Sequence, residues 1–283
     1  MTPKIVCRNV YKCFGPNSAE AISMARDGQS QSEILKQTKS VLALNDISLE
    51  IGAGETFVIM GLSGSGKSTL IRHFNRLVDP TTGQVIVDDT DITTMDRKEL
   101  RTFRRHKISM VFQNFGLLPH RTVLKNVGYG LLMQGRTRKE QDEAAAHWIG
   151  RVGLSGYEHH YPAQLSGGMK QRVGLARALA SDSEILLMDE AFSALDPLIR
   201  TEMQEQLIEL QAQLNKTIVF ITHDPDEAML LGNHIAILRD GTVQQIGTPN
   251  DILENSVNDY VRKFVQNVNL NRLREARPAS IPA

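Results

Sequence analysis

The chain has 283 residues, of which 41% are hydrophobic, enough for a sizeable core. Its 32 basic residues balance its 32 acidic residues, which argues against a generic nucleic-acid binder with a basic excess. The chain has only two cysteines, Cys7 and Cys13, which predicts a reduced cytosolic protein without structural zinc. The N-terminal sequence MTPKIVCRNV has no charged region followed by an apolar one, so no signal peptide is expected. No apolar run approaches the 18 or so residues of a spanning helix, so no membrane span is expected.

Two β segments separated by a polar stretch open the chain. Residues 4–14 and 41–51 are rich in branched side chains and alternate partly, which predicts strands. The polar residues 16–40 between them contain two short helical segments. The second begins with the capping-box spacing of Ser30 and Glu33.

A phosphate-binding pattern follows the next strand. The apolar run FVIMG (57–61) predicts a buried strand, and GLSGSGKST (61–69) after it matches G-x-x-x-x-G-K-[ST]. Glycines let the backbone wrap a triphosphate, Lys67 would neutralise its charge, Ser68 would ligate Mg²⁺ and Thr69 would reach the α-phosphate. The residues predicted to bind nucleotide here are Gly61, Ser63, Gly64, Ser65, Gly66, Lys67, Ser68 and Thr69.

Two further strand candidates and a long helical segment follow. Residues 84–88 and 108–112 are strand candidates, whereas residues 115–165 have a helical character. Thr137 and Glu140 have the spacing of a second capping box, which predicts a helix start.

The α/β character returns in the last third of the chain. Short apolar runs at 185–189, 217–223 and 234–240 are typical of a sheet covered on both faces. An amphipathic helix is expected at about 198–214. The polar tail after about residue 268 is expected to be a solvated end.

Two acids end the first of these runs. Asp189 and Glu190 would lie at the carboxyl edge of the sheet, where ligands bind in open α/β folds. Asp189 can hold Mg²⁺ through water, and Glu190 can act as the general base for an attacking water. The alternative is that the two acids cap the following helix.

Four further motifs complete a family pattern. LSGGMKQR (165–172) resembles the signature motif of ATP-binding-cassette (ABC) ATPases. Gln113 resembles the Q-loop glutamine of that family, SALD (193–196) its D-loop, and His223 its switch histidine.

An aromatic residue near the N-terminus fits the same pattern. Phe14 falls where ABC ATPases place a ring that stacks on adenine, although Tyr11 is close by and a core aromatic residue is the alternative.

The resemblance implies an α/β fold, namely a P-loop NTPase (RecA-like) core with an antiparallel β subdomain and an inserted helical subdomain. Residues 1–270 would form one ABC ATPase domain, with the core at 1–114 and 166–250 and the helical subdomain at 115–165. Residues 251–283 would add a C-terminal helix and a polar tail.

The resemblance also implies a head-to-tail homodimer that hydrolyses ATP with Mg²⁺. Ser166, Gly167 and Gly168 would contact the γ-phosphate held by the partner subunit, which suits the positive end of a helix. Asp196 of the D-loop would belong to the same nucleotide site. The implied catalytic residues are Glu190, His223, Gln113 and Lys67, and the implied metal ligands are Ser68, Gln113 and Asp189.

Within the family, the stretch 16–40 and the sequence around the motifs resemble the ATPases of glycine betaine, proline betaine and choline importers. This implies integral membrane permease subunits, a substrate-binding protein and a peripheral location on the cytoplasmic face of the inner (plasma) membrane, without nucleic acid. Many such ATPases continue into a pair of CBS domains, and a chain that stops at Ala283 is expected to lack them. Trimethylamine N-oxide belongs to the same substrate class.

Leu117, Leu118 and Pro119 are candidate contacts for a permease, or else ordinary loop and core residues. Two other functions stay open: a soluble ABC ATPase without a transport role, and a nucleotide-gated assembly protein. The first would be expected to carry a long coiled-coil or zinc insertion, or two cassettes in one chain, and the second to lack Glu190 or His223.

Overall fold

The computed structural model describes residues 3–193, 195–266 and 268–269. The chain divides into two compact units, which are described one at a time. Unit 1 combines Met1–Asp96 with Ile221–Ala283, and unit 2 is Arg97–Phe220.

Unit 1 contains the N-terminal and C-terminal parts of the chain. Its N-terminal elements are β1 (Pro3–Phe14), α1 (Ser18–Arg26), α2 (Gln31–Thr38), β2 (Val41–Gly52), β3 (Thr56–Met60), α3 (Lys67–Phe74), β4 (Thr82–Val87) and β5 (Thr90–Asp91). Its C-terminal elements are α10 (Pro225–Leu231), β9 (His234–Arg239), β10 (Thr242–Gly247), α11 (Pro249–Glu254) and α12 (Asp259–Val265).

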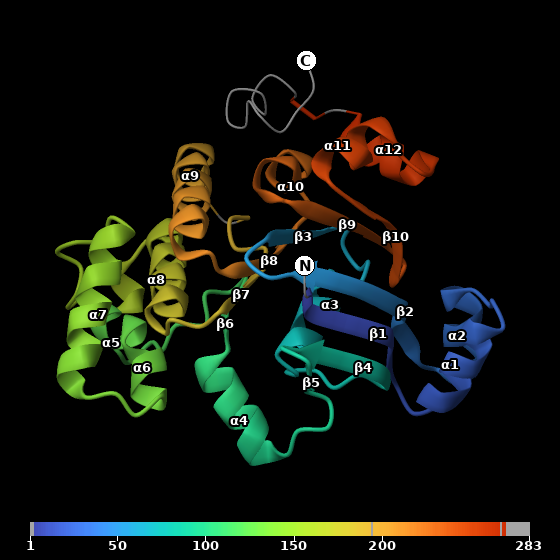
Figure 1. Cartoon of the computed structure of the whole chain (residues 1–283), viewed down its shortest axis with the longest axis horizontal. Helices are drawn as coiled ribbons and strands as arrows, with labels where there is room; N and C mark the ends of the chain where they lie inside the picture. Colours follow the sequence, from blue (N-terminus) through green and yellow to red (C-terminus); the bar gives the residue numbers. More distant parts are fainter. Residues whose placement is uncertain (1–2, 194, 267, 270–283) are drawn as a thin grey trace. The chain divides into compact units, whose positions relative to one another are not determined.

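An antiparallel sheet of order β2-β1-β4-β5 forms one layer of unit 1 (Figure 1). Strand β1 pairs with both neighbours: Ile5 lies opposite Ile51 of β2 and Val87 of β4. These three side chains are almost fully buried, as expected for the inward face of a sheet with one face in the core.

A second group of strands in unit 1 has the order β10-β9-β3. Strand β9 is parallel to β3, with Val58 opposite Ile235, and antiparallel to β10. All five residues of β3 are buried, which explains its continuous apolar sequence. The carboxyl end of β3 leads directly into the loop before α3.

Unit 2 combines short parallel strands with helices. Its elements are α4 (Arg97–His106), β6 (Ile108–Val111), α5 (Val123–Val127), α6 (Tyr129–Met133), α7 (Arg138–Arg151), the 3₁₀ turn η1 (Pro162–Gln164), α8 (Gly167–Ala180), β7 (Ile185–Asp189) and α9 (Pro197–Leu214). Strand β8 (Thr217–Thr222) runs across the boundary between the units, and β8, β7 and β6 are neighbours in that order.

The helices α5, α7 and α8 of unit 2 enclose a separate apolar core (Figure 1). Val123, Ile149 and Val173 are fully buried in it, one from each helix. The capping box predicted for α7 is confirmed, since Thr137 accepts from the Glu140 amide and the Glu140 carboxylate accepts from the Thr137 amide.

The predicted strands and helices are confirmed with small shifts at their ends. The structure adds β5, α4, α10 and β10, which were not predicted, and it has two short helices, α11 and α12, where one C-terminal helix was expected. The predicted domain division stays a prediction. Ala194 of the D-loop and the tail beyond residue 269 lie outside the described residues.

Candidate functional site

The loop between β3 and α3 is shaped by two glycines that no other residue could replace without strain. A Cβ atom on Gly61 would lie 2.4 Å from the Leu238 carbonyl oxygen, and one on Gly66 2.6 Å from the Ala43 carbonyl oxygen. Their φ angles are +156° and +100°. Both positions therefore require glycine, and the backbone of this loop approaches its neighbours closely just before the N-terminus of α3.

Lys67, the first residue of α3, is buried inside this loop with 5% of its surface exposed. Its Nζ donates to the carbonyl oxygens of Gly61 at 2.8 Å and Leu62 at 3.0 Å. The nearby Ser65 Oγ is buried and has no hydrogen-bond partner among the described residues. A buried cation, an unpaired hydroxyl and a helix N-terminus together fit a polyanion such as a triphosphate.

Phe14 ends β1 and leaves 46% of its surface exposed, whereas Tyr11 is buried in the core. The Lys12 ammonium lies 4.7 Å from the centre of the Phe14 ring. Of the two aromatic residues, Phe14 is therefore the one with a ring face accessible to a ligand.

His223 follows β8 directly and is exposed, so it is not a satisfied core histidine. The next residue, Asp224, caps α10 by accepting from the Asp226 amide at 2.9 Å. His223 and Leu62 of the phosphate-loop candidate line the same cavity, which is bounded further by Pro225, Asp226, Tyr260, Lys263 and Phe264.

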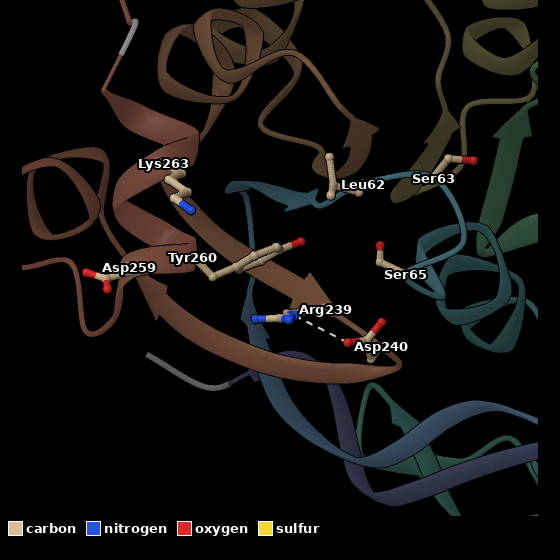
Figure 2. A pocket seen from close by; sticks show the side chains of 8 residues that line it. All are labelled: Leu62, Ser63, Ser65, Arg239, Asp240, Asp259, Tyr260 and Lys263. Atoms are coloured by element: carbon tan, nitrogen blue, oxygen red, sulfur yellow. Dashed lines mark hydrogen bonds and ion pairs between the residues drawn. The ribbon is translucent and has the colours of Figure 1, made fainter. Parts of the chain in front are cut away.

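A neighbouring cavity of about 470 Å³ lies on the same side of the loop (Figure 2). Leu62, Ser63 and Ser65 line it from the loop, and the rest of its lining comes from β9, its following turn and α12: Arg239, Asp240, Asp259, Tyr260 and Lys263. Neither Phe14 nor Lys67 lines it. This cavity therefore flanks the loop and shares only Ser63 and Ser65 with the predicted nucleotide site.

In unit 2, two of the predicted catalytic side chains meet. The Gln113 Nε2 donates to the Glu190 Oε2 at 3.0 Å. Asp189, the residue before Glu190, ends β7 and is fully buried. Glu190 has a φ of +47°, a left-handed conformation that costs about 1 kcal/mol or more in a non-glycine residue. Such strain is concentrated at functional sites.

The alternative role for the two acids, capping the next helix, is excluded. The N-cap of α9 is Asp196, whose Oδ1 accepts from the Ile199 amide at 3.1 Å. Asp189 and Glu190 therefore do not cap α9, and Asp196 has a structural role in its capping.

The signature motif begins α8. Ser166 is the N-cap, and its side chain accepts from the Met169 amide at 3.3 Å. Gly167 and Gly168 form the first helical positions, and a Cβ atom on Gly167 would meet no atom within 4 Å. Because no contact within the described residues requires glycine at position 167, its side-chain-free surface is open to an external group.

Arg177 is a structural partner of the Q-loop that the sequence did not reveal. From α8 it donates to the carbonyl oxygens of Gly116 at 2.7 Å and Phe115 at 3.0 Å, and burial lowers the pKa of its guanidinium. One sequence signal pointed to this role. Arg177 lies on the same helical face as the buried Val173 and Ala180, and an arginine on an apolar face needs hydrogen-bond partners.

The three candidate permease contacts differ in how accessible they are. Leu117 is partly buried and packs against the apolar core of unit 2, as the core alternative expects. Leu118 exchanges two backbone hydrogen bonds with the Asn126 side chain, and Pro119 is exposed. Pro119 is therefore the most accessible of the three.

The predicted site residues thus form two groups, one in each unit. Unit 1 carries Phe14, the phosphate-loop candidate and His223, and unit 2 carries Gln113, Asp189, Glu190, the signature residues and Asp196. Within the described part of the chain, no helix combines the length and apolar character that crossing a membrane requires.

Comparison with known proteins shows which protein family this chain resembles. Residues 44–193 match the family model described as "ABC transporter". The glycine betaine transport ATP-binding protein OpuAA of Bacillus subtilis is 54% identical over 96% of this chain. The trimethylamine N-oxide transport system ATP-binding protein TmoW of Ruegeria pomeroyi is 48% identical over 97% of it. The chain spans 65% of the length of OpuAA and 81% of TmoW.

A solved structure supports the same fold. The ATP-binding cassette MJ0796, in a dimer described as a post-hydrolysis state bound to ADP and phosphate, superposes with a TM-score of 0.75 and 33% identity. The superposition covers 87% of this chain and 99% of MJ0796. The predicted α/β fold of a P-loop NTPase is thereby confirmed.

Proposed function

Because the chain belongs to the ABC transporter family, we propose that it is the ATP-hydrolysing subunit of an importer for glycine betaine or a related methylated amine. Two observations support ATP hydrolysis. Lys67 is buried in the loop before α3, and Gln113 is hydrogen-bonded to Glu190. The substrate class is supported by the 54% identity to OpuAA, against 48% to TmoW.

Unit 1 would bind the nucleotide. The exposed ring of Phe14 would stack on adenine, and the loop amides with Lys67 would hold the phosphates. The residues around Lys67 that would join it are Gly61, Ser63, Gly64, Ser65, Gly66, Ser68 and Thr69.

The donor set proposed for Mg²⁺ suits this ion. Ser68, Gln113 and Asp189 offer oxygen ligands and one carboxylate, and Mg²⁺ typically takes one or two carboxylates together with water and substrate phosphates. When bound, Mg·ATP supplies the phosphoric anhydride bond that is cleaved.

Glu190 would accept the proton of the attacking water. Its left-handed backbone and its hydrogen bond from Gln113 hold the carboxylate in one orientation, which is what a general base needs. His223 would contact the γ-phosphate and the same water.

The signature residues would complete the site of a second subunit. Ser166, Gly167 and Gly168 present the N-terminus of the 14-residue helix α8, with open space at Gly167. Asp196 would support the same interface from the D-loop. We propose that the chain acts as a homodimer on the cytoplasmic face of the plasma membrane, bound to permease subunits that receive substrate from a binding protein.

Uptake in the source organism tests this function. A strain lacking this chain should lose energy-dependent uptake of radiolabelled glycine betaine, and the wild-type chain should restore it. Glu190→Gln should not restore uptake, whereas Glu143→Gln, an exposed glutamate of α7, should. Unchanged uptake of both glycine betaine and trimethylamine N-oxide in the deletion strain would contradict the proposed substrate class.

A further inference from the structure

The helical insertion between β1 and β2, which the proposed function leaves without a task, contacts the turn after Phe14 at one end and the turn between β9 and β10 at the other. We call residues 18–38, which include α1 and α2, the α1–α2 hairpin (Figure 1). Its apolar side packs on the β1 and β2 strands in a small core of Cys13, Ala21, Met24, Ala25, Ile34 and Leu42. The hairpin is therefore an ordered part of unit 1.

One end of the hairpin holds the turn after Phe14. Asn17 donates from its amide to Ser40 Oγ and from its Nδ2 to the Thr38 carbonyl oxygen, both at 3.1 Å. The Ser18 hydroxyl donates to the Gly15 carbonyl oxygen at 3.2 Å. These contacts fix the chain direction immediately beyond the ring proposed to stack on adenine.

The other end of the hairpin reaches the turn between β9 and β10. Gln31, the first residue of α2, donates from its Nε2 to the carbonyl oxygens of Asp240 at 2.7 Å and Leu42 at 3.0 Å. Asp240 and Gln31 are 209 positions apart in sequence, so this contact is a specific tertiary link.

The β9–β10 turn is also hydrogen-bonded to the phosphate-loop candidate. The Gly241 amide donates to the Ser65 carbonyl oxygen at 3.1 Å, and the Asn45 amide donates to the Gly241 carbonyl oxygen at 2.8 Å. Figure 2 shows Asp240 and Ser65 facing the same cavity. A continuous path of hydrogen bonds therefore runs from Gln31 through Asp240 and Gly241 to Ser65.

We propose that the α1–α2 hairpin positions the nucleotide site and that Gln31 is the positioning residue for its phosphate-binding loop. Gln31 touches no reacting group; it acts by holding the Asp240–Gly241 turn against the backbone of the loop. This inference rests on the proposed function, because it assigns Gln31 an effect on the binding of ATP and ADP.

Gln31→Glu tests the inference because it keeps the size of the side chain and removes the N–H donors. An acid in the first turn of α2 is favourable for the helix, so the hairpin should stay folded. Gln37→Glu is the matched control: it adds the same charge at an exposed position of α2. Gln31→Lys restores a donor of sufficient length and should recover binding.

The measurement is the dissociation constant of the purified full chain for fluorescent mant-ATP and mant-ADP, with steady-state ATP hydrolysis beside it. Gln31→Glu should raise both dissociation constants and the KM for ATP by about three- to tenfold, with kcat within about twofold of wild type. Gln37→Glu and Gln31→Lys should match the wild type.

Two results would overturn the inference. If the wild type binds nucleotide and Gln31→Glu behaves as Gln37→Glu does, the positioning role of Gln31 is wrong and the proposed function stands. If the wild type binds neither nucleotide, the proposed function and the inference are both wrong.

Discussion

Lys67 is a charged side chain buried in the loop that it is proposed to serve. Hydrogen bonds from its Nζ to two carbonyl oxygens of the same loop hold the side chain within that loop. A charge held at low exposure interacts more strongly with phosphate than a surface lysine does.

Lys67→Ala should therefore weaken the binding of mant-ATP by about 10- to 100-fold, the range expected for a lost charged hydrogen bond. Lys139→Ala removes a lysine whose side chain is 84% exposed and should leave binding unchanged. Equal affinities of the two variants in a fluorescence titration would show that Lys67 does not contact the nucleotide.

His73 makes the stability of the chain depend on pH. Burial lowers the pKa of His73 from 6.5 to about 4, although a hydrogen bond from its Nδ1 to the Thr69 carbonyl oxygen opposes this shift. The unfolded chain binds a proton near pH 6.5 and the folded chain only near pH 4. Stability is thus retained above this window and lost as the pH falls through it, by about 1.4 kcal/mol per pH unit.

His73→Phe should remove this contribution to the pH dependence. In urea unfolding at pH 5 and pH 7, the wild type should lose more of its free energy of unfolding at pH 5 than the variant does. The same loss in both proteins would assign the pH dependence to other groups.

At the residue scale, the sequence allowed prediction of those site residues that belong to a short local motif. The glycines and Lys67 could be predicted because the motif states the backbone shape directly. The choice between Phe14 and Tyr11 could not, because it depends on which of two residues on β1 faces the core. The left-handed conformation of Glu190 is likewise invisible in sequence.

Helix α8 joins two motifs at the scale of a secondary-structure element. Ser166 caps its start, and Arg177, three turns later, holds the backbone of Phe115 and Gly116. The Q-loop is therefore attached to the same rigid helix that begins with the signature motif.

Arg177→Met should loosen the Q-loop because it keeps the aliphatic stem and removes both hydrogen bonds. Hydrogen–deuterium exchange of the amides in residues 113–118 should become faster by about tenfold, while exchange in residues 61–66 stays unchanged. Arg172→Met is the control, since Arg172 of the same helix contacts Val152 and Glu202 instead. If residues 113–118 exchange at the same rate in Arg177→Met and in the wild type, Arg177 does not support the Q-loop.

Elements with strong local signals were predicted, and elements without them were missed. The capping boxes of α2 and α7 fixed their first residues. In contrast, α4 buries only Phe103 of its ten residues, so it has no apolar stripe to detect. Strand β10 is half polar and gains its stability from pairing with β9, which no local pattern reveals.

At the scale of the whole molecule, the signature residues and the phosphate-loop candidate belong to different units of the chain. The compact units divide at residues 97 and 221, and the helical subdomain predicted at 115–165, which stays a prediction, falls within one of them. Such boundaries depend on contacts between distant segments, which motif order does not report. A resemblance to ABC ATPases was needed to link these motifs across two subunits.

The central claim is that two copies of this chain bind Mg·ATP between them, each completing the site of the other. Glu190→Gln should permit binding and prevent hydrolysis, because it removes the proposed base, and should thereby trap the dimer. Adding Ser166→Arg should block closure without emptying the nucleotide site of the same subunit, since Ser166 caps α8 of unit 2.

The most direct test is the molar mass of Glu190→Gln by light scattering with Mg·ATP, with Mg·ADP, and in the Ser166→Arg background. The account predicts twice the monomer mass with ATP, and the monomer mass in the other two conditions. A Glu190→Gln chain that stays monomeric with saturating ATP, or a Ser166→Arg chain with wild-type turnover, would contradict it.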